Sequence, residues 1–338
     1  MNSKKLLAFM LLVSVFSFST FALDLGDITD LLSDTNAKNP ATFNTENIST
    51  GLDDFTFSLI KTAPSTVSHQ NMWASSYIGQ LLDLPPHLGG GVSFGMAQLK
   101  TEGLATVFKE MGLTYDVKNL FLPTLTFDVR IGGLLIPFDL GVHGMMIKNP
   151  LEFNIQETVF SIDYGTVGAD IRIPLIKEEG ALPNLSIGAG YAYSKGNAGI
   201  NVKEGTACVS AGYESQILQA TVQLSKKILI VEPFVGLRGT LSSNKRNWSW
   251  NYDGTKVLDA KALESLGEEG QALLKETKTF DSGDWSGFAF NKEDPNYTAQ
   301  IFAGIGIDFL FIAQGTLNVS YDLVNQIWAG GLSLRVKF

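Results

Sequence analysis

The chain has 338 residues, with 34 acidic against 25 basic side chains, a formal net charge of −9 and a single cysteine. This acidic balance argues against nucleic acid as a partner, because phosphate binding needs a basic surface. One cysteine excludes an internal disulfide. Hydrophobic residues make up 45% of the chain, yet no segment beyond the N-terminus offers the run of about 18 apolar residues that a transmembrane helix needs.

The N-terminus predicts an export signal. Lys4 and Lys5 precede an apolar run over 6–18, and small residues occupy the positions before a cut after Ala22. We therefore expect residues 1–22 to be a removable signal peptide. An exported chain without a membrane helix is either periplasmic or a barrel in the outer membrane, because only helices and closed barrels satisfy their backbone in lipid.

The segment that follows predicts a short acidic helix over 23–35. Its apolar stripe of Leu25, Ile28, Leu31 and Leu32 is surrounded by aspartates. We expect 23–50 to be a periplasmic extension or, alternatively, a plug that folds into the mouth of a barrel.

Runs that alternate apolar with polar residues then predict β-strands. We expect about twelve of them, within a range of ten to fourteen: 55–59, 70–80, 92–97, 124–130, 138–146, 159–173, 185–194, 207–225, 229–238, 299–309, 316–322 and 328–338. The apolar phase changes near Gly165 and again at Gln216–Ile217, which predicts a bulge in each of these two strands. For the second, a hairpin is the alternative.

The connections between these strands alternate in length. The long ones, 99–120, 148–157, 195–205 and 243–296, fall on one side, and short turns fall on the other. Outer-membrane barrels have long extracellular loops and short periplasmic turns. We therefore expect an antiparallel up-and-down β-barrel over 51–338, with a helix over 259–276 in the longest loop and the start of the chain in the periplasm.

The last strand, Trp328–Phe338, alternates cleanly and ends the chain on an aromatic residue. In this it resembles bacterial outer-membrane β-barrels. The resemblance implies location in the outer membrane, contact with lipid, and Phe338 as the signal for the barrel insertion machinery. Asn39-Pro40-Ala41 also resembles the N-terminal hatch of the long-chain fatty-acid transporter family, and the pattern as a whole resembles uncharacterised porin-like barrels.

Carrying the alternation inward places many charged residues in the lumen. They either form a neutral network that stiffens the barrel or line a constriction that selects a solute. These lumen-lining residues are Asp128, Arg130, Asp139, Asp170, Arg172, Glu232, Arg238, Asp308, Asp322, Arg335 and Lys337.

The long loop carries aromatic residues that either pack on their own barrel or meet a sugar, a lipid or a partner. They are Trp248, Trp250, Tyr252, Trp285, Phe288 and Phe290. The three histidines, His69, His87 and His143, lie in no nucleophile motif and no metal-ligand spacing. We expect no enzymatic activity, no cofactor and no metal. The predicted function is passage of a small solute or hydrophobic compound, and the alternative is a surface binding or adhesion protein that the barrel anchors.

Overall fold

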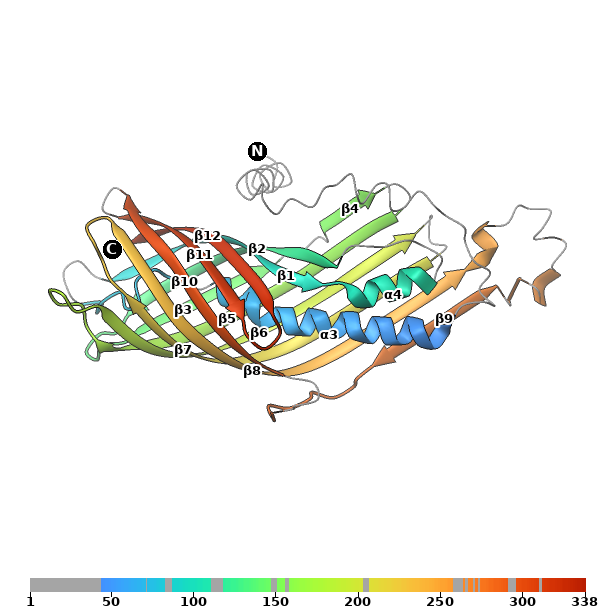
Figure 1. Ribbon diagram of the computed structural model, residues 1–338, viewed down its shortest axis with the longest axis horizontal. Coiled ribbons are helices and arrows are strands. Elements are labelled where there is room, and N and C mark those ends of the chain that lie inside the picture. Colours follow the sequence, from blue (N-terminus) through green and yellow to red (C-terminus); the bar gives the residue numbers. More distant parts are fainter. Residues whose placement is uncertain are drawn as a thin grey trace.

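The computed structural model describes residues 44–70, 72–82, 87–110, 118–146, 151–155, 158–202, 207–257, 264, 267–269, 271–272, 274–290, 296–309 and 312–338. The signal peptide, the helix expected over 23–35 and the Asn-Pro-Ala motif lie outside these residues. Two helices, α3 (Thr45–Gln70) and α4 (Glu102–Glu110), accompany a single large antiparallel sheet (Figure 1). No helix in the described part of the chain is long and apolar enough to cross a membrane.

Among the described residues, ten strands form a closed ring, in which the first strand pairs with both the second and the last. The closing pair is fixed at its end by reciprocal main-chain hydrogen bonds between Leu88 and Phe338. The ring consists of β1 (Leu88–Lys100), β2 (Asn119–Gly132), β3 (Asp139–Met146), β5 (Thr158–Ile176), β6 (Asn184–Val202), β7 (Ala207–Ser225), β8 (Val231–Asp253), β10 (Tyr297–Phe309), β11 (Ala313–Asp322) and β12 (Ile327–Lys337).

Two further strands extend the sheet beyond the ring. β4 (Leu151–Ile155) pairs with the first residues of β5, above β3, and β9 (Lys275–Asp281) pairs with the last residues of β8, above β10. β8 has 23 residues, whereas a strand that spans a membrane needs about 9–11. β5 to β8 therefore rise well past the other strands on one side of the molecule, as Figure 1 shows.

The ring has ten strands, the lower limit of the expected range and not the expected twelve, because the first two expected strands are not strands. Residues 55–59 lie inside α3, and 72–80 are irregular, so the first barrel strand begins at Leu88. The other ten expected strands all correspond to strands of the ring. The helix expected over 259–276 is described only in part: 264, 267–269, 271 and 272 are helical, and Lys275 begins β9.

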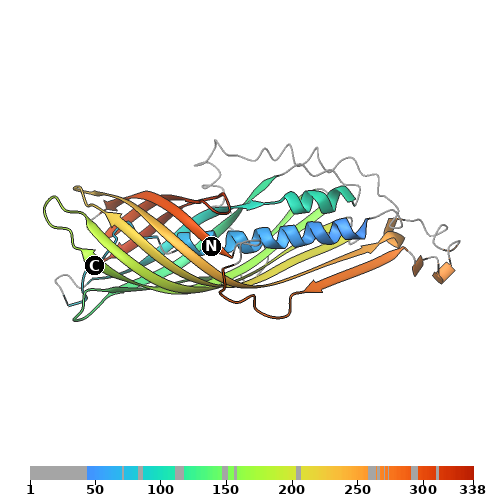
Figure 2. The same cartoon turned by 60° about the horizontal axis from the view of Figure 1, so that its bottom comes forward.

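Helix α3 is capped by Asn44, the residue before it, whose Oδ1 accepts hydrogen bonds from the backbone N–H groups of Glu46 and Asn47. It starts at the long-loop end of the molecule and runs down into the barrel (Figures 1 and 2). Residues 44–50 therefore lie at the opposite end from Phe338; the sequence analysis expected 23–50 to be a periplasmic extension or a plug in the mouth of the barrel.

The bulges expected at Gly165 and at Gln216–Ile217 are absent from these two described strands. The pairing of β6 with β7 runs unbroken from Asn184↔Ser225 to Val202↔Ala207, and the register of β5 shifts only between Pro174 and Ile176. What changes along these strands is the face that is apolar. Tyr213 and Ile217 are buried inside, whereas Leu218 and Val222 are exposed outside.

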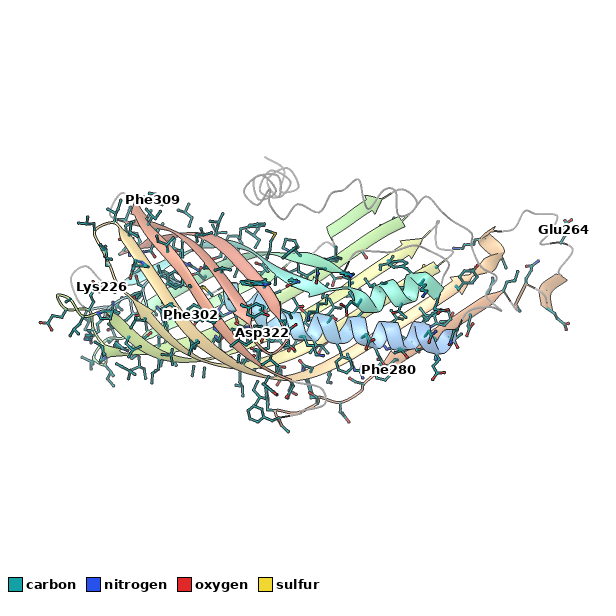
Figure 3. The ribbon with its side chains drawn as sticks, viewed as in Figure 1. Lys226, Glu264, Phe280, Phe302, Phe309 and Asp322 are labelled. Carbon is teal, nitrogen blue, oxygen red and sulfur yellow. The ribbon has the colours of Figure 1, made fainter. Side chains whose placement is uncertain are left out.

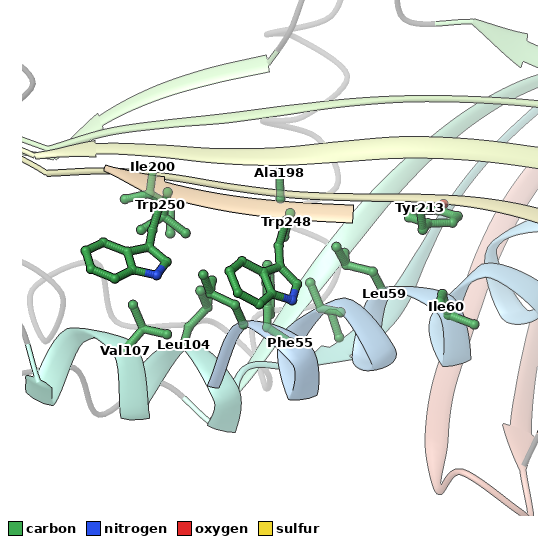
Figure 4. Packing of buried hydrophobic residues seen from close by; sticks show 14 of the residues in the cluster. Phe55, Leu59, Ile60, Leu104, Val107, Ala198, Ile200, Tyr213, Trp248 and Trp250 are labelled. Atoms are coloured by element: carbon green, nitrogen blue, oxygen red, sulfur yellow. The ribbon is translucent and has the colours of Figure 1, made fainter. Parts of the chain in front are cut away.

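This change of face follows from the two surroundings of the sheet. In the upper half the inner face packs against α3 and α4, forming one hydrophobic core with Ile48, Leu52, Phe55, Leu59, Leu104, Val107, Val209, Trp248 and Trp250 (Figure 4). In the lower half the outer face is apolar and exposed, and the inner face is polar.

Candidate functional site

After α3 ends, residues 72–78 cross the lumen and are held mainly through their main chain. Arg335 Nη1 donates to the Met72 carbonyl at 2.7 Å, Arg172 Nη1 to the Ser75 carbonyl at 2.8 Å, and Gln223 Nε2 to the Trp73 carbonyl at 2.8 Å. These donors stand on β12, β5 and β7, so the segment is tied to strands around the ring. We call residues 72–78 the plug segment.

Two side chains of the plug segment are also bound by wall carboxylates. Trp73, which is fully buried, donates from its indole Nε1 to Asp128 Oδ2 at 2.8 Å. Ser75 donates from its hydroxyl to Glu232 Oε2 at 2.7 Å. The guanidinium of Arg335 lies 4.9 Å from the centre of the Trp73 ring. The plug segment therefore fills the lumen near the end at which Phe338 lies.

Behind the plug segment, three aspartates and three arginines form a buried network of equal and opposite charge. The ion pairs are Arg130 with Asp139, Arg130 with Asp170 at 2.7 Å, Arg172 with Asp139 at 2.9 Å and Arg335 with Asp128 at 3.0 Å. A buried charge that lost its partner would cost several kcal/mol. We call these six residues the lumen network; all of them come from the set that the sequence placed inside the barrel.

Other residues of that set lie apart from the network. Lys337 bridges Asp308 at 3.1 Å and Glu232 at 3.7 Å, at the rim beside Phe338. Asp322 accepts hydrogen bonds from the backbone of Val324 and Asn325 and so caps the β11–β12 turn. These contacts are those of structural residues at the two ends of the barrel.

Arg238 stands higher in the lumen and binds the end of α3. Its Nη1 donates to the Ser68 carbonyl at 3.4 Å, its Nε donates to Thr221 Oγ1 at 3.2 Å, and its guanidinium lies 4.9 Å from the centre of the Phe302 ring. Like Arg172 and Arg335, it binds the incoming segment by a main-chain carbonyl. These contacts were not predictable from the sequence, because any residue type can supply a main-chain acceptor.

The loop aromatics divide into two groups. Trp248, Trp250 and Tyr252 point from β8 toward the helices and are buried, as Figure 4 shows for the two tryptophans. Trp285 lies under the Lys245 ammonium at 5.1 Å, and Phe290, which is 75% exposed, meets Tyr297 edge-on. Packing on the protein itself therefore accounts for the buried group, and only Phe288 and Phe290 present large apolar surface outward.

An open groove of about 580 Å³ lies at the mouth of the barrel opposite the Phe338 end, where the wall of the barrel is lowest. Figure 3 shows the difference in height: Asp322, at the top of β11, lies midway along the molecule, far from Glu264 at the long end. The groove is lined by one face of α3, the start of α4 and the β11–β12 turn, that is by Asp54, Phe57, Ser58, Lys61, Thr62, Lys100, Glu102, Gly103, Val324, Asn325, Gln326 and Ile327.

Next to the groove, cationic and aromatic side chains tie α3 to β8. The Arg246 guanidinium lies 3.9 Å from the centre of the Phe57 ring and pairs with Asp53 at 2.7 Å, and Trp248 Nε1 donates to the same carboxylate.

An exposed ion pair lies on the outside of the barrel, at the rim just beyond the exposed apolar surface. There the hydrogen bond from Lys195 lowers the pKa of the Glu214 carboxyl.

The outer surface of the lower barrel indicates the environment in which the barrel lies. Outward-facing apolar side chains from all around the ring are exposed, among them Phe127, Val142, Val167, Leu218, Leu237, Ile301, Leu317 and Leu334. Such a continuous belt is the lipid-facing surface of a transmembrane barrel. The chain folds as a bacterial outer-membrane β-barrel.

No protein-family model matches the chain, and no curated protein matches it. In fold it is similar to several solved barrels. The outer membrane protease OmpT from Escherichia coli shows 12% identity over 75% of this chain and 97% of that one, with a TM-score of 0.42. The translocator domain of autotransporter NalP from Neisseria meningitidis shows 9% identity over 75% and 88%, with a TM-score of 0.36. A Pseudomonas aeruginosa FadL homologue shows 7% identity over 75% and 90%, with a TM-score of 0.26.

Proposed function

We propose that the protein acts at the cell surface as a binding protein, anchored by a barrel whose lumen is filled by its own plug segment. The observation that carries the proposal is the set of bonds between the plug segment and six wall strands, from β2 to β12. A filled lumen leaves the extracellular half as the working part of the molecule.

The extracellular half supports this proposal because it is a folded unit with its own hydrophobic core rather than a loose loop. Its core unites α3, α4 and the upper parts of β6, β7 and β8. The groove beside α3 is an open concave surface of this half, and it combines charged, polar and aromatic lining groups of the kind that ligand sites use.

Passage of a small solute or hydrophobic compound is the second candidate, and the polar wall of the lumen favours it. Many inward side chains of the lower barrel are hydroxyl or amide groups that water can solvate, among them Ser93, Thr126, Ser186, Gln223, Thr316 and Ser333. Passage through this lumen requires the plug segment to move away.

Conductance of the full-length protein in planar lipid bilayers tests the choice between the two functions. The proposal expects a silent bilayer, because the plug segment blocks the path. Steady openings of the wild-type protein would overturn it and favour passage.

A double variant, Arg335→Gln with Lys337→Gln, then reports on the path itself. In a conducting lumen it raises the permeability of cations over anions. That shift shrinks in high salt, since the Debye length falls from about 10 Å at 0.1 M to about 3 Å at 1 M. In a filled lumen it lowers thermal stability and leaves the bilayer silent.

A further inference from the structure

The groove beside α3 lies at the height of the outer membrane surface. Trp328 is 53% exposed on the outside of β12, and its ring centre is 4.6 Å from that of Tyr321 on β11. Exposed aromatic pairs at strand ends mark the membrane–water interface of barrels. The turn between these two strands, Val324–Ile327, supplies one wall of the groove. The groove therefore begins where the aromatic belt ends, among the lipid headgroups.

The same side of the molecule leaves α3 uncovered. β11 and β12 end at this short turn, whereas β5 to β8 continue upward behind the helix (Figures 1 and 2). Asp54, Phe57, Ser58 and Lys61 share one helical face by their spacing, and all four line the groove. A molecule at the membrane surface can thus reach this helical face by passing sideways over the low rim.

Lys100 connects the groove to the lipid-facing side of the barrel. It follows Met96 and Gln98 on the outward face of β1, and Gln98 Oε1 accepts a hydrogen bond from the Trp328 backbone N–H. A lysine directly above an aromatic belt places its ammonium among headgroup phosphates while its stem covers apolar surface.

The lining charges are balanced and of both signs. Lys61 and Lys100 supply two ammonium groups, and Asp54 and Glu102 supply two carboxylates. Phe57 adds an aromatic face that already carries the Lys61 ammonium at 5.5 Å. A purely anionic ligand would meet repulsion from the two carboxylates, whereas a zwitterion satisfies both pairs.

From these observations we infer that the groove binds a zwitterionic phosphoethanolamine headgroup carried by a lipid at the membrane surface. The phosphate would lie against Lys61 and Lys100, and the amine against Asp54 and Glu102. This inference rests on the proposed surface-binding function and names the ligand class of that site.

Binding of a short-chain phosphatidylethanolamine to the purified full-length protein tests it, read by native mass spectrometry and by Trp fluorescence. We expect saturable binding that the double variant Lys61→Gln with Lys100→Gln weakens by about tenfold. Lys278→Gln, an exposed lysine on β9, is the matched control and should bind like the wild type. Heat-modifiable migration confirms that each variant is folded.

Two comparison lipids make the result decisive. Phosphatidylglycerol has the phosphate without the amine and should bind more weakly; Asp54→Asn with Glu102→Gln should remove that preference. Equal affinity for the two lipids in the wild type, or unchanged binding by the lysine double variant, would overturn the inference. If glycerophosphoethanolamine, which lacks the acyl chains, binds as tightly as the lipid, the headgroup need not come from a lipid and that part of the inference is wrong. A conducting wild-type barrel with intact lipid binding would instead overturn only the surface-binding function.

Discussion

Asp139 shows how much of this barrel depends on single buried charges. Its carboxylate is fully buried and binds both Arg130 and Arg172, and its Oδ2 also accepts the backbone N–H of Ile78. One residue on the wall therefore neutralises two arginines and holds the end of the plug segment.

Replacing Asp139 by Asn should consequently destabilise the protein by about 3–5 kcal/mol, because it leaves two buried arginines with too little negative charge. Denaturant unfolding of the refolded protein in detergent measures this loss. The matched control is Glu214→Gln, whose pairing with Lys195 is exposed, so it should cost at most about 1 kcal/mol. Equal losses for the two variants would show that the lumen network adds nothing beyond a surface pair.

At the scale of elements, the packing of α3 on α4 depends on two glycines. A Cβ on Gly103 would lie 2.3 Å from the Gly51 carbonyl oxygen, and a Cβ on Gly51 would lie 2.7 Å from that of Gly103. The two helices touch backbone to backbone at this point, which only glycine permits.

Gly103→Ala should therefore push the two helices apart and lower the stability of the half of the molecule that contains them by about 1–3 kcal/mol. Hydrogen exchange of α3 and of the lower strands separates the two parts of the molecule: protection should fall in α3 and remain in β1, β2 and β12. Thr106→Ala, on the exposed side of the same helix, should leave both unchanged. Uniform loss of protection over all strands would mean that the two halves unfold together.

The lipid-facing surface gives a second prediction at this scale. Leu334 is 55% exposed on the outer face of β12, so Leu334→Arg should cost about 2–4 kcal/mol in a bilayer. Asn201 also points outward, but near the end of β6 beyond the apolar belt, and Asn201→Arg should be tolerated. Folding into lipid vesicles at increasing denaturant compares the two. Equal tolerance of the two substitutions would contradict the assignment of the lower barrel to the membrane.

Some of these strands and helices could be predicted from the sequence alone, and others could not. Ten strands were predictable because apolar and polar residues alternate over most of each strand. Residues 55–59 were misread because Phe55, Phe57 and Leu59 alternate, although the stripe Ile48, Leu52, Phe55 and Leu59 has the spacing of a helix. The bulges were inferred from a change of apolar face that the internal helices cause, and no pattern along one strand reveals what lies across the lumen.

The inward position of the charged residues followed from strand alternation, but their partners did not. Arg172 and Arg335 bind carbonyls of the plug segment, and Trp73 binds Asp128 from a stretch expected to be a strand. Such contacts join residues far apart in the chain and depend on how the plug segment crosses the lumen. A single sequence does not encode that path as a local pattern.

For the whole molecule, the direction of α3 sets which end of the chain meets the outside. The helix starts beside α4, where Asn47 Nδ2 donates to Glu110, and descends toward the periplasmic end, where β1 begins next to Phe338. The described structure therefore begins at the end opposite Phe338. We predict that this end faces the outside, because the long connections of outer-membrane barrels are extracellular, whereas an even number of strands alone suggested that both ends of the chain lie in the periplasm.

Cysteine labelling of intact cells should reveal this direction. In a Cys208→Ser background, Glu46→Cys lies on the exposed side of the first turn of α3 and should react with a membrane-impermeant maleimide from outside. Glu179→Cys lies in the exposed turn between β5 and β6, at the Phe338 end, and should react only after the outer membrane is permeabilised. Because both sites are exposed in the folded protein, a difference in labelling reports the side of the membrane. Labelling of Glu179→Cys but not of Glu46→Cys in intact cells would reverse the orientation and place the groove, the extracellular core and the start of α3 in the periplasm.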